Sequence, residues 1–159
     1  MPTLTLQRDL PFPRPAVYRA IADIARYPEF MPGFKHVRTE GWDGDALRVR
    51  QTVGAGGITT TFLSRATFAP PERIDIVSHD PPFRELRQTW RFEDRDGGRT
   101  RLHLVAEYAL ADRLAGAVFN RVFPGLLRAG MTAVGRRVAK LRRQGAPEDM
   151  ALIPEREST

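Results

Sequence analysis

The chain has 159 residues, a formal net charge of +6 at pH 7 and no cysteine. This length favours a single domain with its own core, and the missing cysteines exclude disulfides, thiolate metal sites and a cysteine nucleophile. The first residues lack a basic region followed by an apolar run, and no apolar run approaches the ~20 residues of a spanning helix, so we expect neither a signal peptide nor a transmembrane segment.

An amphipathic helix followed by an aromatic loop is predicted near the N-terminus, after a strand at 3–10. Apolar residues recur at near-helical spacing from Val17 to Ile24. We expect the helix to end at Tyr27-Pro28, because the residue before a proline is displaced from α geometry. The loop from there to Phe34 carries almost no charge. A loop this apolar is expected to be buried or to bind a ligand.

A series of antiparallel strands is predicted in the middle of the chain. Apolar and polar residues alternate in short runs, and turn sequences such as Asp43-Gly44 separate them. The alternation is typical of a sheet with one covered and one solvated face. The expected strands are 37–42, 46–53, 58–68, 73–79, 83–92 and 101–110.

A long helix is predicted to cover this sheet. Asp112 is the expected N-cap, and about thirty residues of helix would be roughly 45 Å long. Pro124 lies within it and is expected to kink or split the helix near Arg121. The apolar rows expected to face the sheet include Leu114, Val118, Val122 and Leu126. A curved sheet wrapped around one helix would enclose a cavity, because the helix cannot fill both ends of it.

Several motifs resemble those of the coenzyme Q-binding START-domain family, within the wider polyketide cyclase and lipid-transfer superfamily. The resemblance rests on Val17-Tyr18, Asp23, Tyr27-Pro28-Glu29-Phe30-Met31-Pro32, Ser64-Arg65-Ala66-Thr67-Phe68 with Pro70-Pro71, and Pro82-Phe83-Arg84-Glu85-Leu86 with Trp90-Arg91-Phe92. It implies an α+β helix-grip (START-like) fold, a curved antiparallel β-sheet around a long C-terminal helix. We expect one ligand-binding domain at 1–144 and a flexible tail at 145–159.

The resemblance and the apolar cavity together predict non-catalytic binding of a hydrophobic ligand, ubiquinone or a polyprenyl lipid, by a carrier or chaperone supporting respiratory electron transport. Such ligands need apolar walls and a few hydrogen-bonding groups. No other cofactor is required, and the protein is expected in the cytoplasm, in peripheral contact with the inner membrane. The predicted ligand-binding residues are Tyr27, Phe30, Met31, Phe34, Gln51, Phe62, Ser64, Gln88, Trp90, Tyr108, Phe119 and Phe123.

Two alternatives remain open, because relatives of this kind include toxins and enzymes. A ribosome-association toxin would contact RNA phosphates through a basic cluster near the C-terminus: Arg128, Arg136, Arg137, Lys140, Arg142 and Arg143. An aromatic polyketide cyclase or dehydratase would need an acid or base in the cavity, and only Tyr108 is a candidate.

No catalytic or metal-binding set is recognisable in the sequence, and no DNA partner is expected. His36, His79 and His103 fall on different predicted strands, and His103 is expected on the outer face. The acidic residues and histidines show no metal-ligand spacing.

Overall fold

The structure, a computed structural model, describes residues 2–55, 57–145 and 153–154. Seven strands form one antiparallel sheet in the order β1-β7-β6-β5-β4-β3-β2. Their bounds are β1 Thr3–Leu10, β2 Phe34–Asp43, β3 Ala46–Ala55, β4 Ile58–Ala69, β5 Arg73–Ser78, β6 Phe83–Arg95 and β7 Arg99–Leu110. The predicted meander is confirmed, although β2 begins three residues earlier than expected and β6 ends three residues later.

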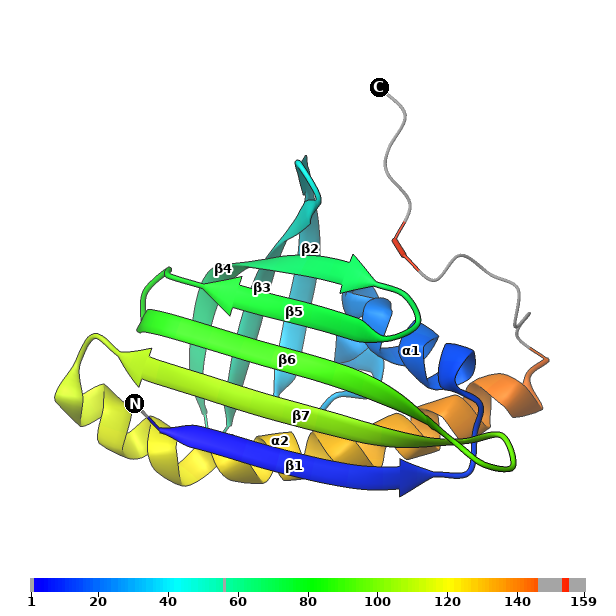
Figure 1. The fold of residues 1–159 in the computed structure, drawn as a ribbon. Helices are drawn as coiled ribbons and strands as arrows, with labels where there is room; N and C mark the ends of the chain where they lie inside the picture. The colour runs from blue at the N-terminus through cyan, green and yellow to red at the C-terminus, as the bar shows by residue number, and fades with distance from the viewer. Residues whose placement is uncertain (1, 56, 146–152, 155–159) are drawn as a thin grey trace.

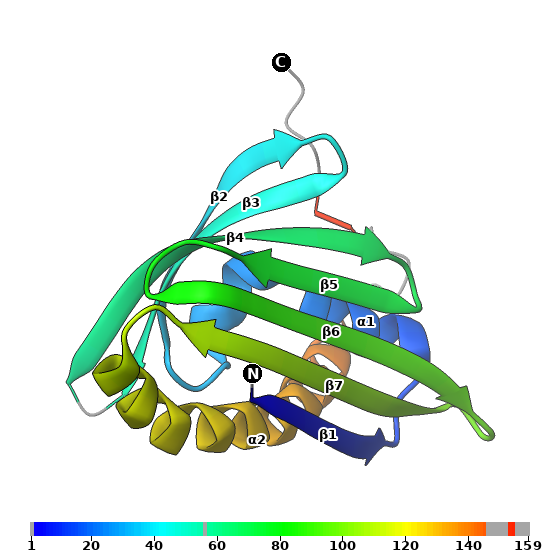
Figure 2. The same cartoon turned by 60° about the vertical axis from the view of Figure 1, so that its left-hand side comes forward.

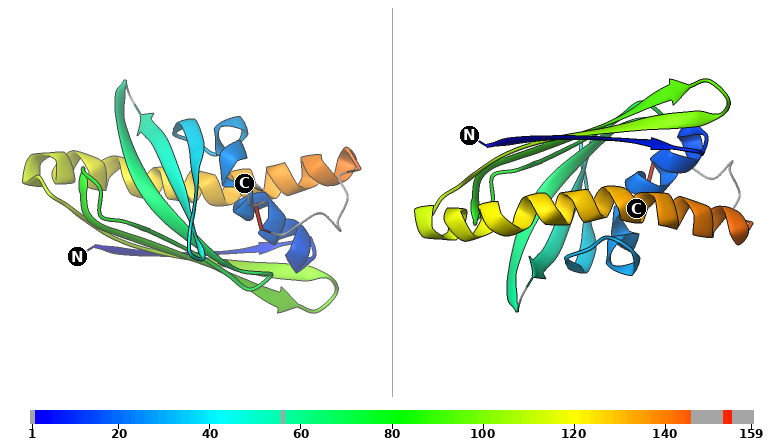
Figure 3. Two further views of the ribbon diagram at one scale, coloured as in Figure 1. Left: turned by 90° about the horizontal axis from the view of Figure 1, so that it is seen from above. Right: turned by 90° about the horizontal axis from the view of Figure 1, so that it is seen from below.

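The sheet curves around the long helix α2, Arg113–Arg143, which runs along its concave side (Figures 1 and 2). Seen from above and below, β2–β4 cross α2, whereas β1 and β7 run more nearly along it (Figure 3). The helix α1, Arg14–Ala22, and the 3₁₀ helix η1, Ile24–Glu29, lie beside the C-terminal half of α2 (Figure 1). The expected helix-grip arrangement is therefore present.

Two separate clusters of buried side chains make up the interior. The larger one joins α1, the C-terminal half of α2 and the sheet, with Ile21, Leu104 and Val134 all fully buried. The smaller one is aromatic. It contains Phe62, Phe83, Leu86 and Tyr108, with Phe119 and Phe123 of α2 packed against them. The helix thus contacts the sheet through aliphatic packing at one end and through aromatic rings at the other.

The first helix ends earlier than the sequence predicted. α1 stops at Ala22, and η1 continues through Pro28, so Tyr27-Pro28 is not the point of termination. The Tyr27 hydroxyl donates a hydrogen bond to the Ile21 carbonyl. In a longer helix that carbonyl would accept from the amide four residues on. The Tyr27 side chain replaces this partner and folds the next segment back against α1.

Pro124 does not divide α2, contrary to the expected kink or split. The helix is continuous from Arg113 to Arg143, and Figure 3 shows it as one rod without a sharp bend. A proline at this position leaves the Asn120 carbonyl without its helical donor. Asn120 is exposed, so water can take the place of that donor. Asp112 is the N-cap as predicted, because its Oδ1 accepts the Leu114 amide at 2.7 Å.

The N-terminal half of α2 is not covered on all of its apolar side. Leu114, Val118 and Val122 were expected to face the sheet, yet their side chains are 82%, 51% and 37% exposed. These three side chains face solvent because the neighbouring row of α2, with Phe119 and Phe123, makes the contact with the sheet. Of the predicted tail at 145–159, only Gly145, Ile153 and Pro154 lie within the described residues.

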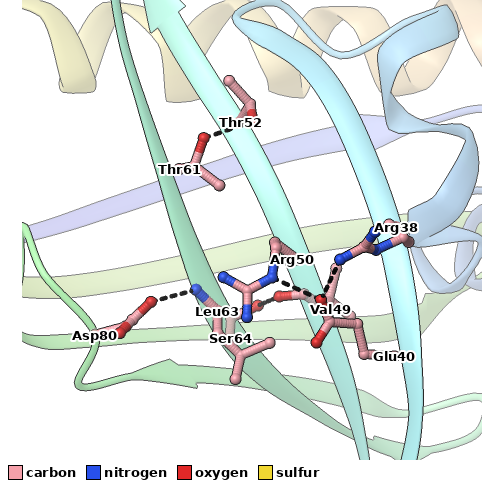
Figure 4. Close-up of polar contacts among 9 residues, drawn as sticks. All are labelled: Arg38, Glu40, Val49, Arg50, Thr52, Thr61, Leu63, Ser64 and Asp80. Carbon is pink, nitrogen blue, oxygen red and sulfur yellow. Dashed lines mark hydrogen bonds and ion pairs between the residues drawn. The ribbon is translucent and has the colours of Figure 1, made fainter.

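Polar and charged side chains cover the convex face of the sheet. Glu40 accepts hydrogen bonds from Arg38 Nη2 at 2.9 Å and Arg50 Nε at 2.6 Å (Figure 4). These two guanidinium groups, Arg50 first, lower the pKa of Glu40 to about 2. On the same face Thr52 and Thr61 share a hydrogen bond of 2.8 Å between their hydroxyls (Figure 4). This face is solvated, as the strand alternation predicted.

Replacement of one buried leucine and one exposed leucine tests the assignment of the core. Leu104 is fully buried in the larger cluster, so Leu104→Ala is expected to lower the free energy of unfolding by about 2–5 kcal/mol. Leu114→Ala makes the same chemical change at a side chain that is 82% exposed, and should alter stability by less than about 0.5 kcal/mol. Urea unfolding measures both; equal losses would contradict the packing described here.

Candidate binding cavity

A cavity of about 430 Å³ lies between the two clusters and is lined by members of both. Its walls come from η1 and the loop after it, from strands β2 to β6, from the end of β7 and from α2. Among its described lining residues, only Thr59, Val118 and Val122 are exposed. The mouth therefore lies between the β3–β4 hairpin and the N-terminal half of α2.

Most of the predicted ligand-binding residues line this cavity. They reach it from five separate parts of the chain, which the fold brings together around one space. The nine that do so are Tyr27, Met31, Phe34, Gln51, Phe62, Gln88, Trp90, Phe119 and Phe123.

Three predicted residues do not line it. Phe30 points to the other side of its loop and packs beneath the guanidinium of Arg137, 5.1 Å from the ring centroid. Ser64 is buried, and its hydroxyl donates to the Val49 carbonyl at 3.4 Å (Figure 4). Tyr108 lies behind the wall, with its ring 5.4 Å from Phe119 and 4.9 Å from Phe123. Alternation along a strand identifies the covered face but not which of its residues reach the cavity.

The polar side chains at the cavity are few, and three of them have no partner among the described residues. Trp90 is 4% exposed, and among the described residues its indole Nε1 is a buried donor with no hydrogen bond. The side-chain amides of Gln51 and Gln88 bond to no other described residue. A buried N–H without an acceptor destabilises the protein by about 1–3 kcal/mol. A ligand that offers acceptors would relieve this penalty.

The aromatic loop is held in place on both sides. Gly33 has φ +84°, and an added Cβ would lie 3.1 Å from Leu126 Cδ1. The Gly33 carbonyl accepts a hydrogen bond from the Gly54 amide at 2.8 Å. Met31 Sδ occupies the space left by Gly130, 3.3 Å from where a Cβ would be. Two glycines thus let the loop lie directly on α2. This role of the two glycines was not predicted from the sequence, although Gly130 continues the four-residue spacing of Val118, Val122 and Leu126.

Two residues of the predicted basic cluster lie over aromatic rings, and the other four are exposed to solvent. The Arg137 side chain is only 10% exposed, stacks on Phe30 and lies 3.6 Å from Glu29. The Arg142 guanidinium lies 6.0 Å from the Phe12 ring. Arg128, Arg136, Lys140 and Arg143 are exposed. A second hollow of about 550 Å³ lies on this side of α2, lined by Glu29, Phe30, Arg136, Arg137 and Lys140 among others.

The histidines lie outside the cavity lining. His103 Nε2 is 2.9 Å from Glu93 Oε2 on the outer face, as predicted, and His79 Nδ1 is 3.3 Å from the Arg84 carbonyl. His36 is exposed. Within the described residues there is no group of three or more histidine or acidic side chains suited to a metal ion. No helix in the described part of the chain has the length and apolar character needed to cross a membrane.

Comparison with known proteins agrees with this architecture. The family model described as "Polyketide cyclase / dehydrase and lipid transport" matches residues 10–131. The chain belongs to this family. The match extends from the end of β1 into the middle of α2, so it spans the aromatic loop, the remaining strands and both walls of the cavity.

Similar proteins carry different functional names. The ribosome association toxin RatA of Pseudomonas aeruginosa is 26% identical over 114 residues, covering 72% of this chain and 79% of that protein. The mitochondrial coenzyme Q-binding protein coq10 of Schizosaccharomyces pombe is 26% identical over 114 residues, covering 69% and 70%. The crystal structure of the Zhui aromatase/cyclase from Streptomyces sp. R1128 aligns with a TM-score of 0.77 at 19% identity, covering 91% and 98%. These likenesses establish the helix-grip fold of the superfamily.

Substitution of Gly33 tests the close contact between the loop and α2. Gly33→Ala should lower the free energy of unfolding by about 1–2 kcal/mol for its left-handed backbone alone, and by more because its Cβ would meet Leu126. Gly41→Ala is the matched control, since Gly41 has φ +83° but nothing within 4 Å of an added Cβ. Urea unfolding of both variants isolates the contact; equal losses would show that the loop does not lie against Leu126.

Proposed function

We propose that the protein binds an amphiphilic ligand with an apolar body and a hydrogen-bond-accepting head group, a ubiquinone or a related polyprenyl lipid, and acts as its carrier. The observation that carries this proposal is a largely apolar cavity whose lining includes Gln51, Gln88 and Trp90. Each of these side chains carries a hydrogen-bond donor that is bonded to no other described residue. A quinone offers two carbonyl acceptors to such donors and an isoprenoid chain to the apolar walls.

The geometry of β6 supports one orientation of the ligand. The cavity wall on this strand runs from Phe83, near the N-terminal half of α2, to Trp90, within the larger of the two clusters. Seven residues of strand span about 23 Å. The donors at Gln88 and Trp90 therefore lie at the inner end, and the head group would enter first. A volume of 430 Å³ is near the lower end for ligand pockets, so a long tail would leave through the mouth.

The chemistry of the lining supports binding without catalysis. Among the described residues that line the cavity, Tyr27 alone carries a titratable side chain. Its hydroxyl is engaged by the Ile21 carbonyl, and burial raises its pKa. Tyr108, the candidate acid or base for a cyclase, lies behind Phe119 and Phe123. General acid–base catalysis needs a group within hydrogen-bonding reach of the substrate, and this lining supplies no suitable one.

The similarity to coq10 supports a quinone among the candidate amphiphiles, because that relative is named as a coenzyme Q-binding protein. Burial of the tail would supply most of the affinity, at about 25 cal/mol per Å² before the free energy of ordering is subtracted. On this proposal the protein needs no other cofactor. It would work in the cytoplasm at the periphery of the inner membrane and support respiratory electron transport.

Binding of a short-tailed ubiquinone tests the proposal. Gln88→Leu removes the side-chain amide with little change in volume, and Trp90→Phe removes the indole N–H together with part of the ring. Each should weaken quinone binding about three- to tenfold. An alkylbenzene with the same tail has no carbonyl groups, so its affinity should fall less than twofold in both variants. Arg91→Gln, on the outer face of the same strand, is the matched control and should bind like the wild type. Isothermal titration calorimetry measures all three.

Two results would contradict the proposal. The first is that organic extraction and mass spectrometry of the purified protein recover no quinone or lipid and titration detects no binding. The second is that the quinone and the alkylbenzene lose affinity equally in Gln88→Leu and Trp90→Phe.

Association with the large ribosomal subunit is the second candidate function, favoured by the charge of α2. Residues 113–143 include eight basic residues and no acidic one. Arg136 and Lys140 are exposed beside the second hollow, where an anionic group could reach both. Similarity to a protein named as a ribosome association toxin adds support.

Sedimentation with large ribosomal subunits tests this second candidate. Binding through phosphates should fall steeply with salt, and a combined Arg136→Ala and Lys140→Ala variant should reduce the slope of log K against log salt by about 1 for each lost contact. Arg91→Gln removes a charge from the far side of the sheet, and should change neither the binding to large subunits nor its dependence on salt. Absence of cosedimentation at low salt would exclude this function.

A further inference from the structure

Three apolar side chains on the N-terminal half of α2 form the most exposed apolar row of the described molecule. Leu114, Val118 and Val122 are 82%, 51% and 37% exposed and follow one another at intervals of four residues. Such a spacing places them in one row on the helix surface. An exposed apolar row beside polar residues marks an interaction surface.

This apolar row is continuous with the mouth of the cavity. Val118 and Val122 line the cavity and also face solvent. One turn further toward the N-terminus, Leu114 extends the same row beyond the cavity. A ligand that enters or leaves would therefore pass along this row.

Basic residues flank the same row. Arg121 and Arg128 follow Leu114 by seven and fourteen residues, so they lie near its side of the helix, and both are exposed. Arg113 is exposed at the start of α2. A helix with an exposed apolar row beside arginines has the pattern of one that lies in the plane of a membrane interface.

We infer that the N-terminal half of α2 docks on an anionic phospholipid bilayer, with Leu114 and the cavity mouth against the acyl region and Arg113, Arg121 and Arg128 against the phosphates. Charge favours this occupant over a second copy of the chain. A twofold contact through the row would bring Arg121 and Arg128 close to their own copies, and like charges in contact oppose association. The anionic head groups of a bilayer neutralise them instead.

The docked orientation gives the cavity a direct opening into lipid. An amphiphile could then slide from the bilayer along Val118 and Val122 without crossing water. This loading role rests on the proposed function, whereas the docking depends only on α2 and the lipid. The two can therefore fail separately.

The absence of cysteine from the chain allows a clean test. Leu114→Cys carries a single environment-sensitive fluorophore on the row, and Asp96→Cys carries it on the β6–β7 hairpin, at the opposite end of the molecule (Figure 2). Vesicles of phosphatidylcholine containing one third phosphatidylglycerol should shift the Leu114→Cys label to the blue and leave the Asp96→Cys label unchanged. Vesicles of phosphatidylcholine alone should give a much smaller response.

Flotation with the same mixed vesicles measures the contributions of the row and its charges. Leu114→Gln should reduce the bound fraction about tenfold, and Arg121→Gln about fivefold at low salt. Arg99→Gln removes the same charge on the distant β6–β7 hairpin and should bind like the wild type. Neither Leu114 nor Arg121 lines the cavity, so titration with a short-tailed quinone should be unaffected in all three variants.

The proposal is overturned if Leu114→Gln floats like the wild type, or if the Asp96→Cys label responds as strongly as the Leu114→Cys label. It is also overturned if light scattering shows a dimer that Leu114→Gln dissociates and that does not bind vesicles. The row would then be an interface between copies. If the wild-type protein binds vesicles but binds no quinone, the proposed function is refuted and the membrane docking still holds.

Discussion

The cavity exists because a straight helix cannot remain in contact with a strongly curved sheet along its whole length. At the C-terminal half of α2, aliphatic side chains such as Val134 and Val138 close the gap to the sheet. At the other half the gap is bridged by rings: Phe119 stacks on Phe123 with centroids 4.5 Å apart, and Phe83 of β6 meets Phe119 edge-on at 5.3 Å. These rings hold the helix away from the sheet. Between the two contacts, the described side chains leave a cavity of about 430 Å³.

The aromatic loop contributes to this hollow and to a second one further along α2. Tyr27 and Met31 line the cavity, whereas Phe30, between them in the chain, stacks under Arg137. The cavity and the second, basic hollow thus share one short segment with two faces. One face lines a largely apolar cavity, and the other lines a hollow that includes Arg136, Arg137 and Lys140.

Sequence reasoning succeeded where a pattern has one structural meaning. The alternation along β6 and β7 identified the covered face, and the Asp112 N-cap was placed correctly. It failed where a tertiary contact decides the outcome. The end of α1 depends on the Tyr27 hydroxyl reaching Ile21, and the exposure of Leu114 depends on which row of α2 meets the aromatic cluster. In the sequence, Ser64 and Gln51 are both polar residues at inward-facing strand positions. Only the structure shows that the Ser64 hydroxyl is already hydrogen-bonded to a carbonyl of the neighbouring strand.

The most direct measurement is a crystal structure of the protein with a short-tailed ubiquinone. We expect electron density between the sheet and α2, with a ring oxygen within hydrogen-bonding distance of Trp90 Nε1 or the Gln88 amide and the tail leaving past Val122. Side chains that fill this space in the crystal, or a quinone bound only on the outer surface, would contradict it.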